Sequence, residues 1–259
     1  MEIGAFTGYV DVAQVVLYVF WGFFFGLLIY LHREDKREGY PLESSRSAIA
    51  PRVPIQGFPA VPAPKVYRLA GGRTVLAPAA AKERPNLALV RTSPAFGAPF
   101  EPTGNAMQDG VGPASYALRA EHPEMMIDGS AMIVPMRVAT DFHVDDSDLD
   151  LRGLPVFGSD DRKAGVVADL WIDRSEPQIR YVEAAVAGGS RKVLLPIQMV
   201  NIDKTRRDLS MSCVTAAQIV DGPVIGNPDF VTLLEEDRIT GYYAGGTLYS
   251  TPDKLEPIL

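Results

Sequence analysis

The hydrophobic pattern begins with one long apolar run. Residues 12–31 contain no charged side chain, and Gln14 is their one strongly polar member. At 1.5 Å per residue, a helix of this length spans about 30 Å, the thickness of the hydrocarbon core of a bilayer. The pattern predicts a transmembrane helix over 12–31 with Asp11 as its N-cap. Gly22 and Gly26 are spaced as GxxxG, which makes them candidates for close helix packing.

The flanks of this run predict its orientation. Residues 1–11 contain neither Lys nor Arg, whereas residues 32–37 contain three of them. The positive-inside rule therefore places residues 1–11 in the periplasm and the chain after residue 31 in the cytoplasm. A cleaved signal peptide is the alternative, but it requires a basic start, and the only charged residue in 1–10 is Glu2. The candidates for contact with lipid headgroups are Tyr30, Arg33, Lys36, Arg37 and Tyr40.

Residues 32–113 form the next region, and proline dominates most of it. Twelve of the 21 prolines lie between Pro41 and Pro113, a density that excludes long helices and central strands. The same segment is too rich in Val, Leu and aromatic residues for a flexible linker. We therefore expect an extended apolar strap, with short strands near 65–69, 73–77 and 87–91, that lies against another protein surface.

Residues 114–259 show the pattern of a small β domain. Short strands are predicted at 133–139, 155–157, 164–173, 179–187, 191–196, 198–203 and 208–214. Residues 180–187 alternate as in a half-buried strand, and Gly188-Gly189-Ser190 suits a hairpin turn. This spacing favours an antiparallel barrel. The capping box at Thr232-Leu233-Leu234-Glu235 predicts a helix to about Ala244, ended by Gly245-Gly246.

Charge and composition exclude several classes of function. A net charge of −7 argues against a nucleic-acid-binding protein, and Cys213 as the only cysteine excludes a disulfide framework or a Cys-rich metal site. The three histidines are scattered, so no metal site is predicted. The EF-hand-like start at 146–150 has Leu151 where Gly is needed and Phe157 where Glu is needed. Without a Walker A or G-x-S-x-G motif, the sequence does not indicate an enzyme.

The remaining candidate chemistry is a set of carboxylates with arginines between them. The set comprises Asp169, Asp173, Glu176 and Glu183, with Arg174 and Arg180. A carboxylate in a turn, such as Glu176, is usually a solvated charge. If another subunit buried it, desolvation would raise its pKa and allow it to relay protons near neutral pH. The residues alone leave both possibilities open.

Several strings of residues resemble one known family. They are Arg37-Glu38-Gly39-Tyr40-Pro41-Leu42, Pro102-Thr103-Gly104-Asn105, the stretch 109–116, Pro135-Met136-Arg137-Val138-Ala139, Phe142-His143-Val144, 233–237 and 243–246. In this order behind one anchor, the chain resembles the H subunit of the purple-bacterial photosynthetic reaction centre over essentially its whole length. The strings 153–156 and 165–169 also look like a PRC-barrel. The expected fold is a single N-terminal transmembrane helix followed by a mainly antiparallel β cytoplasmic domain, PRC-barrel-like, with a short C-terminal helix.

The resemblance implies a role in light-driven electron transfer. An H subunit caps the cytoplasmic face of the L and M subunits in the intracytoplasmic (chromatophore) membrane and binds none of the cofactors by itself. Bacteriochlorophyll, bacteriopheophytin, two quinones, non-haem iron and carotenoid belong to L and M. A cytochrome subunit, a light-harvesting antenna and membrane lipids are further expected partners.

The resemblance also implies a proton path to the secondary quinone. Asp173, Glu176 and Arg180 match family positions near that path, and Glu236 is a further candidate. Some relatives carry two histidines where this chain has Asp128 and Ser130, so proton uptake here is expected to use Asp128, Glu124 or other surface acids. An inhibitory metal site is not expected at this place.

Two other functions are compatible with parts of the pattern. An anchored PRC-barrel adaptor without pigments would share the span and the barrel, but it would not need a strap of about 70 residues rich in apolar side chains. A membrane-anchored hydrolase would need a nucleophile with a neighbouring base, and no such constellation is visible.

Overall fold

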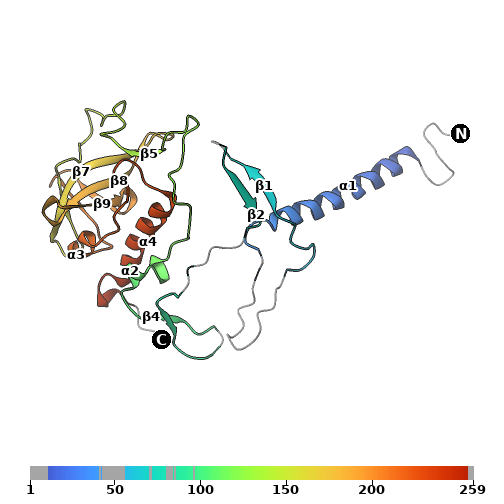
Figure 1. Ribbon diagram of the computed structural model, residues 1–259, viewed down its shortest axis with the longest axis horizontal. Helices are drawn as coiled ribbons and strands as arrows, with labels where there is room; N and C mark the ends of the chain where they lie inside the picture. Colours follow the sequence, from blue (N-terminus) through green and yellow to red (C-terminus); the bar gives the residue numbers. More distant parts are fainter. Residues whose placement is uncertain are drawn as a thin grey trace. The chain divides into compact units, whose positions relative to one another are not determined.

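The protein folds as two compact units. The computed structural model describes residues 11–40, 42, 56–69, 72–79, 84, 86–95 and 97–255, and Figure 1 shows its ribbon. The first unit comprises residues 1–81 and 93–98, and the second comprises residues 82–92 and 99–259. The predicted strap over 32–113 is therefore divided between the two units, and each unit is described separately.

The first unit begins with the predicted apolar helix. Helix α1 spans Val12–Asp35, four residues beyond the predicted end. Asp11 caps it as expected: its Oδ1 accepts a hydrogen bond from the Gln14 amide at 2.8 Å, and the Gln14 side chain accepts one from the Asp11 amide at 3.3 Å. Every residue of this helix is at least partly exposed, and α1 is long and apolar enough to cross a membrane.

The strap forms a small hairpin in the first unit. Strands β1 (Lys65–Arg68) and β2 (Thr74–Ala77) pair in antiparallel fashion, with Val66 opposite Leu76. Two strands near these positions were predicted, and they are confirmed. All four residues of β1 and the first three of β2 are exposed, so the described residues of the first unit do not provide the hairpin with a core.

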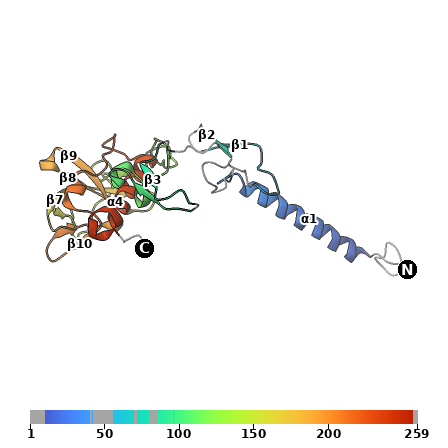
Figure 2. The ribbon, with the colours of Figure 1, turned by 90° about the horizontal axis from the view of Figure 1, so that it is seen from below.

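A seven-stranded sheet forms the body of the second unit. The strand order is β10-β11-β6-β7-β8-β9, and β5 pairs with β7. Figure 2 shows β7, β8 and β9 side by side. The strands are β5 (Ile133–Pro135), β6 (Pro155–Phe157), β7 (Lys163–Asp173), β8 (Gln178–Val186), β9 (Arg191–Pro196), β10 (Asn201–Asp203) and β11 (Asp208–Ser210). The pairing is antiparallel except between β11 and β6, which are parallel. The predicted mainly antiparallel barrel is confirmed, with this one parallel pair as the exception.

The strands surround a closely packed core. Its fully buried side chains include Leu170, Trp171, Val182, Leu195, Leu209, Ile219 and Tyr243. Burial of each large aliphatic side chain contributes about 1.5–3 kcal/mol. This core lies wholly within the second unit.

The half-buried strand predicted over 180–187 is wrong, because β8 is buried on both faces. Tyr181 and Glu183 of one face are buried like Val182 of the other. The Tyr181 hydroxyl bonds to Glu236 on helix α4 (Leu233–Tyr249), and the Glu183 carboxylate bonds to Trp171 of β7. Because an ionic and hydrogen-bonded layer covers this second face, polar residues do not indicate exposure in β8.

The C-terminal helix is longer than predicted. Helix α4 begins after Thr232, whose capping box with Glu235 is confirmed, and it ends at Tyr249 instead of near Ala244. Gly245 and Gly246 lie within the helix because it packs closely against its neighbours. A Cβ atom on Gly245 would clash with Ala114, and one on Gly246 would overlap Val214 and the Cys213 carbonyl. These glycines permit close approach and do not end the helix.

Other predicted strands are shorter than expected. The stretch 133–139 forms a strand only to Pro135, whose carbonyl then accepts amide bonds from Val138 and Ala139 in a turn. The stretch 198–203 is divided between a 3-10 turn and β10, and 208–214 is a strand only to Ser210. The remaining elements are β3 (Leu89–Arg91), β4 (Phe100–Pro102), α2 (Ala106–Asp109), η2 (Gly112–Ala114), η3 (Ala187–Gly189), η4 (Ile197–Met199), α3 (Ala216–Val220) and η5 (Pro252–Lys254).

Candidate functional site

Asp173 ends strand β7 and organises the turn that leads into β8. Its Oδ1 accepts hydrogen bonds from the Ser175 hydroxyl at 2.6 Å and from the amides of Ser175 and Glu176 at 2.9 and 3.2 Å. Burial alone would raise the pKa of Asp173, but these hydrogen bonds together hold the pKa below its ordinary value. Asp173 is therefore a charged carboxylate that fixes the turn.

Glu176 lies at the exposed tip of the same turn. Its Oε2 accepts a hydrogen bond from the Gln178 side chain at 3.1 Å, and the residue is open to solvent in this chain. The geometry fits the solvated carboxylate that sequence reasoning weighed. Burial of Glu176 by another subunit stays a prediction.

Asp128 lies in a neighbouring loop that is tied to this turn. The loop closes by a bridge between Met125 and Ala131, and Asp128 Oδ1 accepts bonds from the Ser130 hydroxyl at 2.5 Å and its amide at 2.8 Å. These bonds lower the pKa of Asp128. Arg174 joins the two segments, since its Nη2 donates to the Ser130 hydroxyl at 2.7 Å and to the Ala131 carbonyl. The structure thus brings the predicted residues Asp128, Asp173 and Glu176 to one part of the barrel.

Glu236 lies in a different place, at the wall of a cavity of about 480 Å³. The Tyr181 hydroxyl donates a hydrogen bond to Glu236 Oε2 at 3.1 Å. Burial raises the pKa of Glu236, and the Tyr181 hydrogen bond and the charges of Arg180 and Arg119 offset only part of this effect. Burial also raises the pKa of Tyr181, so this hydroxyl keeps its proton and remains a donor. Of the predicted carboxylates Asp128, Asp173 and Glu236, only Glu236 has a raised pKa.

Arg180 lines the same cavity, together with Arg119 and Asp237. Arg119 Nη1 lies 3.2 Å from Asp237 Oδ1. The carboxylates of Glu236 and Asp237, the guanidinium groups of Arg119 and Arg180 and the Tyr181 hydroxyl therefore line one cavity that has room for several water molecules. Such an arrangement suits a chain of waters and titrating groups. Sequence reasoning missed Tyr181 and Arg119. The residues next to Tyr181 in the sequence give no signal of its hydrogen-bond partner on a distant helix.

Asp169 and Glu183, the other two carboxylates of the interleaved set, are bound to Arg137. Arg137 Nη1 lies 3.1 Å from Asp169 Oδ2 and 3.3 Å from Glu183 Oε2. Both carboxylates are buried. They belong to an ionic network of the barrel, apart from the cavity beside Glu236.

Two of the predicted lipid contacts have partners within the first unit. The buried Lys36 ammonium donates to the carbonyls of Gln56 and Pro59 at 2.5 and 2.6 Å. Arg37 forms a two-bond ion pair with Glu34 at 2.8 and 2.9 Å, and it donates to the Ala63 and Ala77 carbonyls at 2.9 and 3.0 Å. Both residues therefore have a structural role, because these contacts tie the end of α1 to the strap.

The structure does not assign a role to the other residues that were predicted to contact lipid or a partner helix in the first unit. Tyr30 and Arg33 are exposed, and the Tyr40 ring lies 5.4 Å from Lys36 Nζ in a cation–π contact. Gly22 and Gly26 have open space where a side chain would project. Their roles in lipid contact and helix packing stay predictions. Among the described residues, no group of three His, Cys, Asp or Glu side chains could hold a metal ion.

Comparison with known families gives two matches. The family described as photosynthetic reaction centre, H-chain N-terminal region, matches residues 4–138, which is more than half of the chain. The PRC-barrel domain matches residues 145–209, which include β6 to β10 and all but the last residue of β11. The first match covers α1 and the strap, and the second covers most of the sheet.

Proposed function

The chain belongs to the photosynthetic reaction centre H-chain family, and we propose that it caps the cytoplasmic face of the L and M subunits. It is a structural subunit that associates with L and M, and it supplies part of the proton path to the secondary quinone. The observation that carries this proposal is the match over residues 4–138. Bacteriochlorophyll, bacteriopheophytin, the quinones, non-haem iron and carotenoid are assigned to L and M, with none held by this chain alone.

The exposed apolar side chains of the strap support the capping role. Phe58, Val66 and Leu76 are 78%, 60% and 51% exposed. Exposed apolar side chains along the strap and its hairpin, which no described residue of the first unit buries, are typical of a region that is buried in an assembly. A large partner on the cytoplasmic side would cover it and gain the free energy of its burial. L and M are the partners that the family implies.

The proton path is assigned to two groups of residues. At the barrel surface, Asp128, Glu176 and Arg174 form the candidate region of proton uptake. The second group, Glu236 with Tyr181 and Arg180, is the candidate relay within the proposed path, because a carboxylate with a raised pKa exchanges protons closer to neutral pH. Asp173 is assigned a supporting role, since its lowered pKa keeps it charged and its hydrogen bonds hold the turn.

The membrane arrangement follows from the charge distribution. Residues 1–11 are assigned to the periplasm, residues 12–31 to the bilayer, and the chain after residue 31 to the cytoplasmic side of the intracytoplasmic membrane, because the basic residues lie at the C-terminal end of α1. Tyr30 and Arg33 are assigned to the lipid headgroups. A cytochrome subunit and a light-harvesting antenna are candidate neighbours of the complex.

The first test is gentle detergent purification of the chain from its native membranes, followed by a near-infrared absorption spectrum. The proposal predicts bacteriochlorophyll bands and co-purification of two larger membrane polypeptides. A colourless, monodisperse protein without those polypeptides would reject it in favour of the anchored PRC-barrel adaptor.

The second test addresses the proton path in the purified complex. Glu176→Gln and Glu236→Gln are each expected to slow the proton-coupled second electron transfer to the quinone, more strongly as pH rises. Asp161→Asn, at an exposed position in the turn between β6 and β7 and outside the strap, is the control and should leave the rate unchanged. An unchanged rate across pH in either variant would remove that residue from the path.

A further inference from the structure

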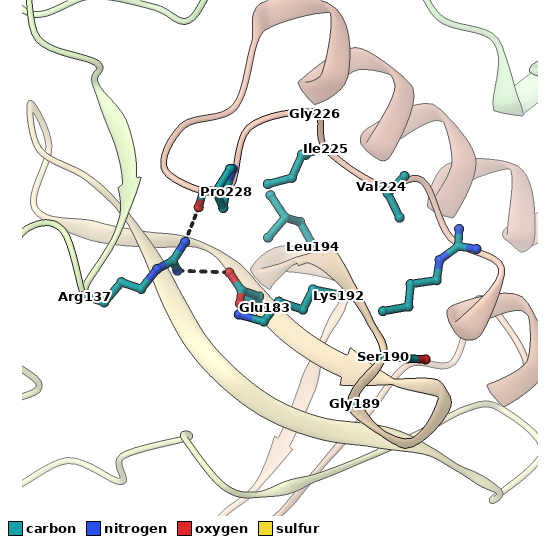
Figure 3. A pocket seen from close by; sticks show the side chains of 11 residues that line it. Arg137, Glu183, Gly189, Ser190, Lys192, Leu194, Val224, Ile225, Gly226 and Pro228 are labelled. Carbon is teal, nitrogen blue, oxygen red and sulfur yellow. Dashed lines mark hydrogen bonds and ion pairs between the residues drawn. The ribbon is translucent and has the colours of Figure 1, made fainter.

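The cavity beside the β8–β9 turn has a polar wall whose main charges already pair with one another. It has a volume of about 430 Å³, and Figure 3 shows Arg137 linked to Glu183 and Pro228 at its edge. Lys192 Nζ lies 2.6 Å from Glu183 Oε1. Another cavity of the second unit has cations with donors to spare, and it is the better candidate for a binding site.

This other cavity lies between residues 84–89 of the strap and residues 110–118, all within the second unit. Its volume is about 520 Å³, within the range of about 300–1,000 Å³ that is usual for binding pockets. We call it the strap groove. Tyr116 lines both this groove and the cavity beside Glu236.

One wall of the strap groove is apolar. Leu87, Leu89 and Leu118 line it. Leu87 is 47% exposed, an arrangement that costs free energy unless another apolar group covers the side chain. Val90 and Phe100, on the adjoining β3–β4 hairpin, are each 51% exposed. The groove is therefore part of a larger exposed apolar surface along the strap.

Arg84 supplies a fixed positive charge to the same groove. Its Nη1 donates to the Gly110 carbonyl and its Nη2 to the Asp109 carbonyl, both at 2.6 Å. Its guanidinium carbon lies 4.1 Å from the centre of the Tyr116 ring. A guanidinium has five N–H donors, and these two bonds leave three of them for a partner. Arg84 is thus held in place and can still bind an acceptor.

A second guanidinium lies against the same ring. Arg238 of α4 is exposed, and its guanidinium carbon is 5.2 Å from the centre of the Tyr116 ring. In the described parts of the chain Arg238 has no ion pair, and no carboxylate lines the groove. The neighbouring Asp237 pairs with Arg119 at 3.2 Å. Two positive charges against one ring repel each other, and a carboxylate between them would offset this repulsion.

We propose that the strap groove receives a segment of the L or M subunit that presents a carboxylate next to an apolar side chain. The carboxylate pairs with Arg84 and Arg238, since charge-assisted bonds of this kind are strong. The apolar side chain covers Leu87, Leu89 and Leu118.

The strap itself argues for L or M as the occupant. Residues 84–89 belong to the strap, and its exposed apolar side chains are already assigned to these subunits. The proposal therefore rests on the proposed capping function, and it adds the chemistry of one contact: an acidic group beside an apolar one.

Hydroxyl-radical footprinting of the wild-type chain tests whether the groove is covered. The oxidation of Leu87 is compared in the full chain alone, in detergent, and in the complex from native membranes. We expect it to slow at least about fivefold in the complex, because an interface excludes water. Leu76 of the β1–β2 hairpin, which lies outside the groove, reports the capping function separately.

A pair of charge reversals tests the acidic partner. Arg238→Glu should remove most of the protection of Leu87 in the complex and leave that of Leu76 unchanged, because like charges then face each other. Arg162→Glu, at a surface position whose side chain is 83% exposed, should leave both unchanged. Arg238 is exposed, so urea unfolding of the isolated variant should match that of the wild-type chain.

The outcomes separate this proposal from the capping function. Protection of Leu76 without protection of Leu87 would reject the groove and leave capping intact, whereas protection of neither would reject both. Equal protection of Leu87 in the Arg238 and Arg162 variants would reject the acidic partner. Footprinting of the chain alone in vesicles of phosphatidylethanolamine and phosphatidylglycerol in equal parts tests the membrane as the occupant. Full protection of Leu87 there would also overturn the proposal.

Discussion

The two units of this protein bury their apolar side chains to very different degrees. In the second unit, Leu170, Val182 and Leu195 are completely buried within the sheet. In the first unit, α1 and the β1–β2 hairpin leave their apolar side chains exposed. The barrel therefore has a core of its own, whereas the apolar side chains of α1 and the hairpin stay exposed within the first unit. Under the proposed function, the bilayer and the L and M subunits cover them.

The largest expected effect on the free energy of unfolding is that of replacing a leucine in the core of the second unit, and a leucine of the strap serves for comparison. Leu170→Ala should destabilise the full chain in detergent by about 2–5 kcal/mol, because it leaves a cavity in a closed core. Leu76→Ala should change the free energy of unfolding by no more than about 0.5 kcal/mol, since its side chain is half exposed. Urea unfolding measures both values. Similar losses for the two variants would contradict the comparison.

Lys36 is the exception within the first unit, and its replacement gives the next largest effect. Lys36→Met removes the ammonium and leaves the Gln56 and Pro59 carbonyls without their donor, at a cost of about 1–3 kcal/mol. Hydrogen exchange of the non-proline amides at 56–63 should accelerate. Arg33→Met, at an exposed position on α1, is the control and should leave those amides unchanged. If both variants behave alike, the Lys36 contacts do not hold the strap.

Glu236 and Asp173 should have opposite effects on the pH dependence of stability. The pKa of Glu236 is raised from an ordinary value of 4.5, so its contribution to stability is full below that value and is lost as pH rises through the raised pKa. The pKa of Asp173 is lowered from 3.8, so its contribution is present above that value and is lost as pH falls through the lowered pKa.

Variants of Glu236 and Asp173 test whether the two carboxylates change stability in opposite directions as pH rises. Relative to wild type, Glu236→Gln should gain stability as pH rises above about 4.5. Asp173→Asn should be less stable than wild type above about pH 3.8, and the gap should close in more acidic solution. Urea unfolding between roughly pH 3 and pH 8 measures both trends. Trends of the same sign would show that the two carboxylates do not differ as described.

The smallest expected effect on stability is that of Glu176→Gln. The residue lies at an exposed turn, so the free energy of unfolding of the isolated chain should change by less than about 0.5 kcal/mol. Thermal unfolding of the two chains measures this. A larger loss would indicate that Glu176 has a structural contact in the chain itself, and any slowing of electron transfer in the complex would then have a second explanation.

The sequence predicted the elements whose signals are local. The apolar run of α1, its N-cap Asp11 and the capping box at Thr232 need only neighbouring residues, and all three are confirmed. The end of α4 was predicted wrongly at Gly245-Gly246. A glycine pair looks the same whether it ends a helix or admits a close neighbour, and the neighbour, Ala114, is far away in the sequence.

The candidate site was predictable only in part for the same reason. The turn that holds Asp173 and Glu176 is a local signal, and their place in a proton path was inferred from the family resemblance. Their environments were not predicted: Asp173 is hydrogen-bonded and charged, whereas Glu236, which was given less weight, has a raised pKa. Likewise, nothing near Lys36 in the sequence shows that the carbonyls of Gln56 and Pro59 surround its ammonium. Long-range contacts set burial, and burial sets both the charge state and the structural role of these groups.

The most direct test of the account compares hydrogen exchange in the full chain alone, in detergent, with exchange in the complex from native membranes. The account predicts that the amides of β1 and β2 become at least tenfold better protected in the complex, while those of β7 and β8 are equally protected in both samples. Equal exchange of the hairpin amides in the two samples would contradict the claim that the first unit is completed by its partners.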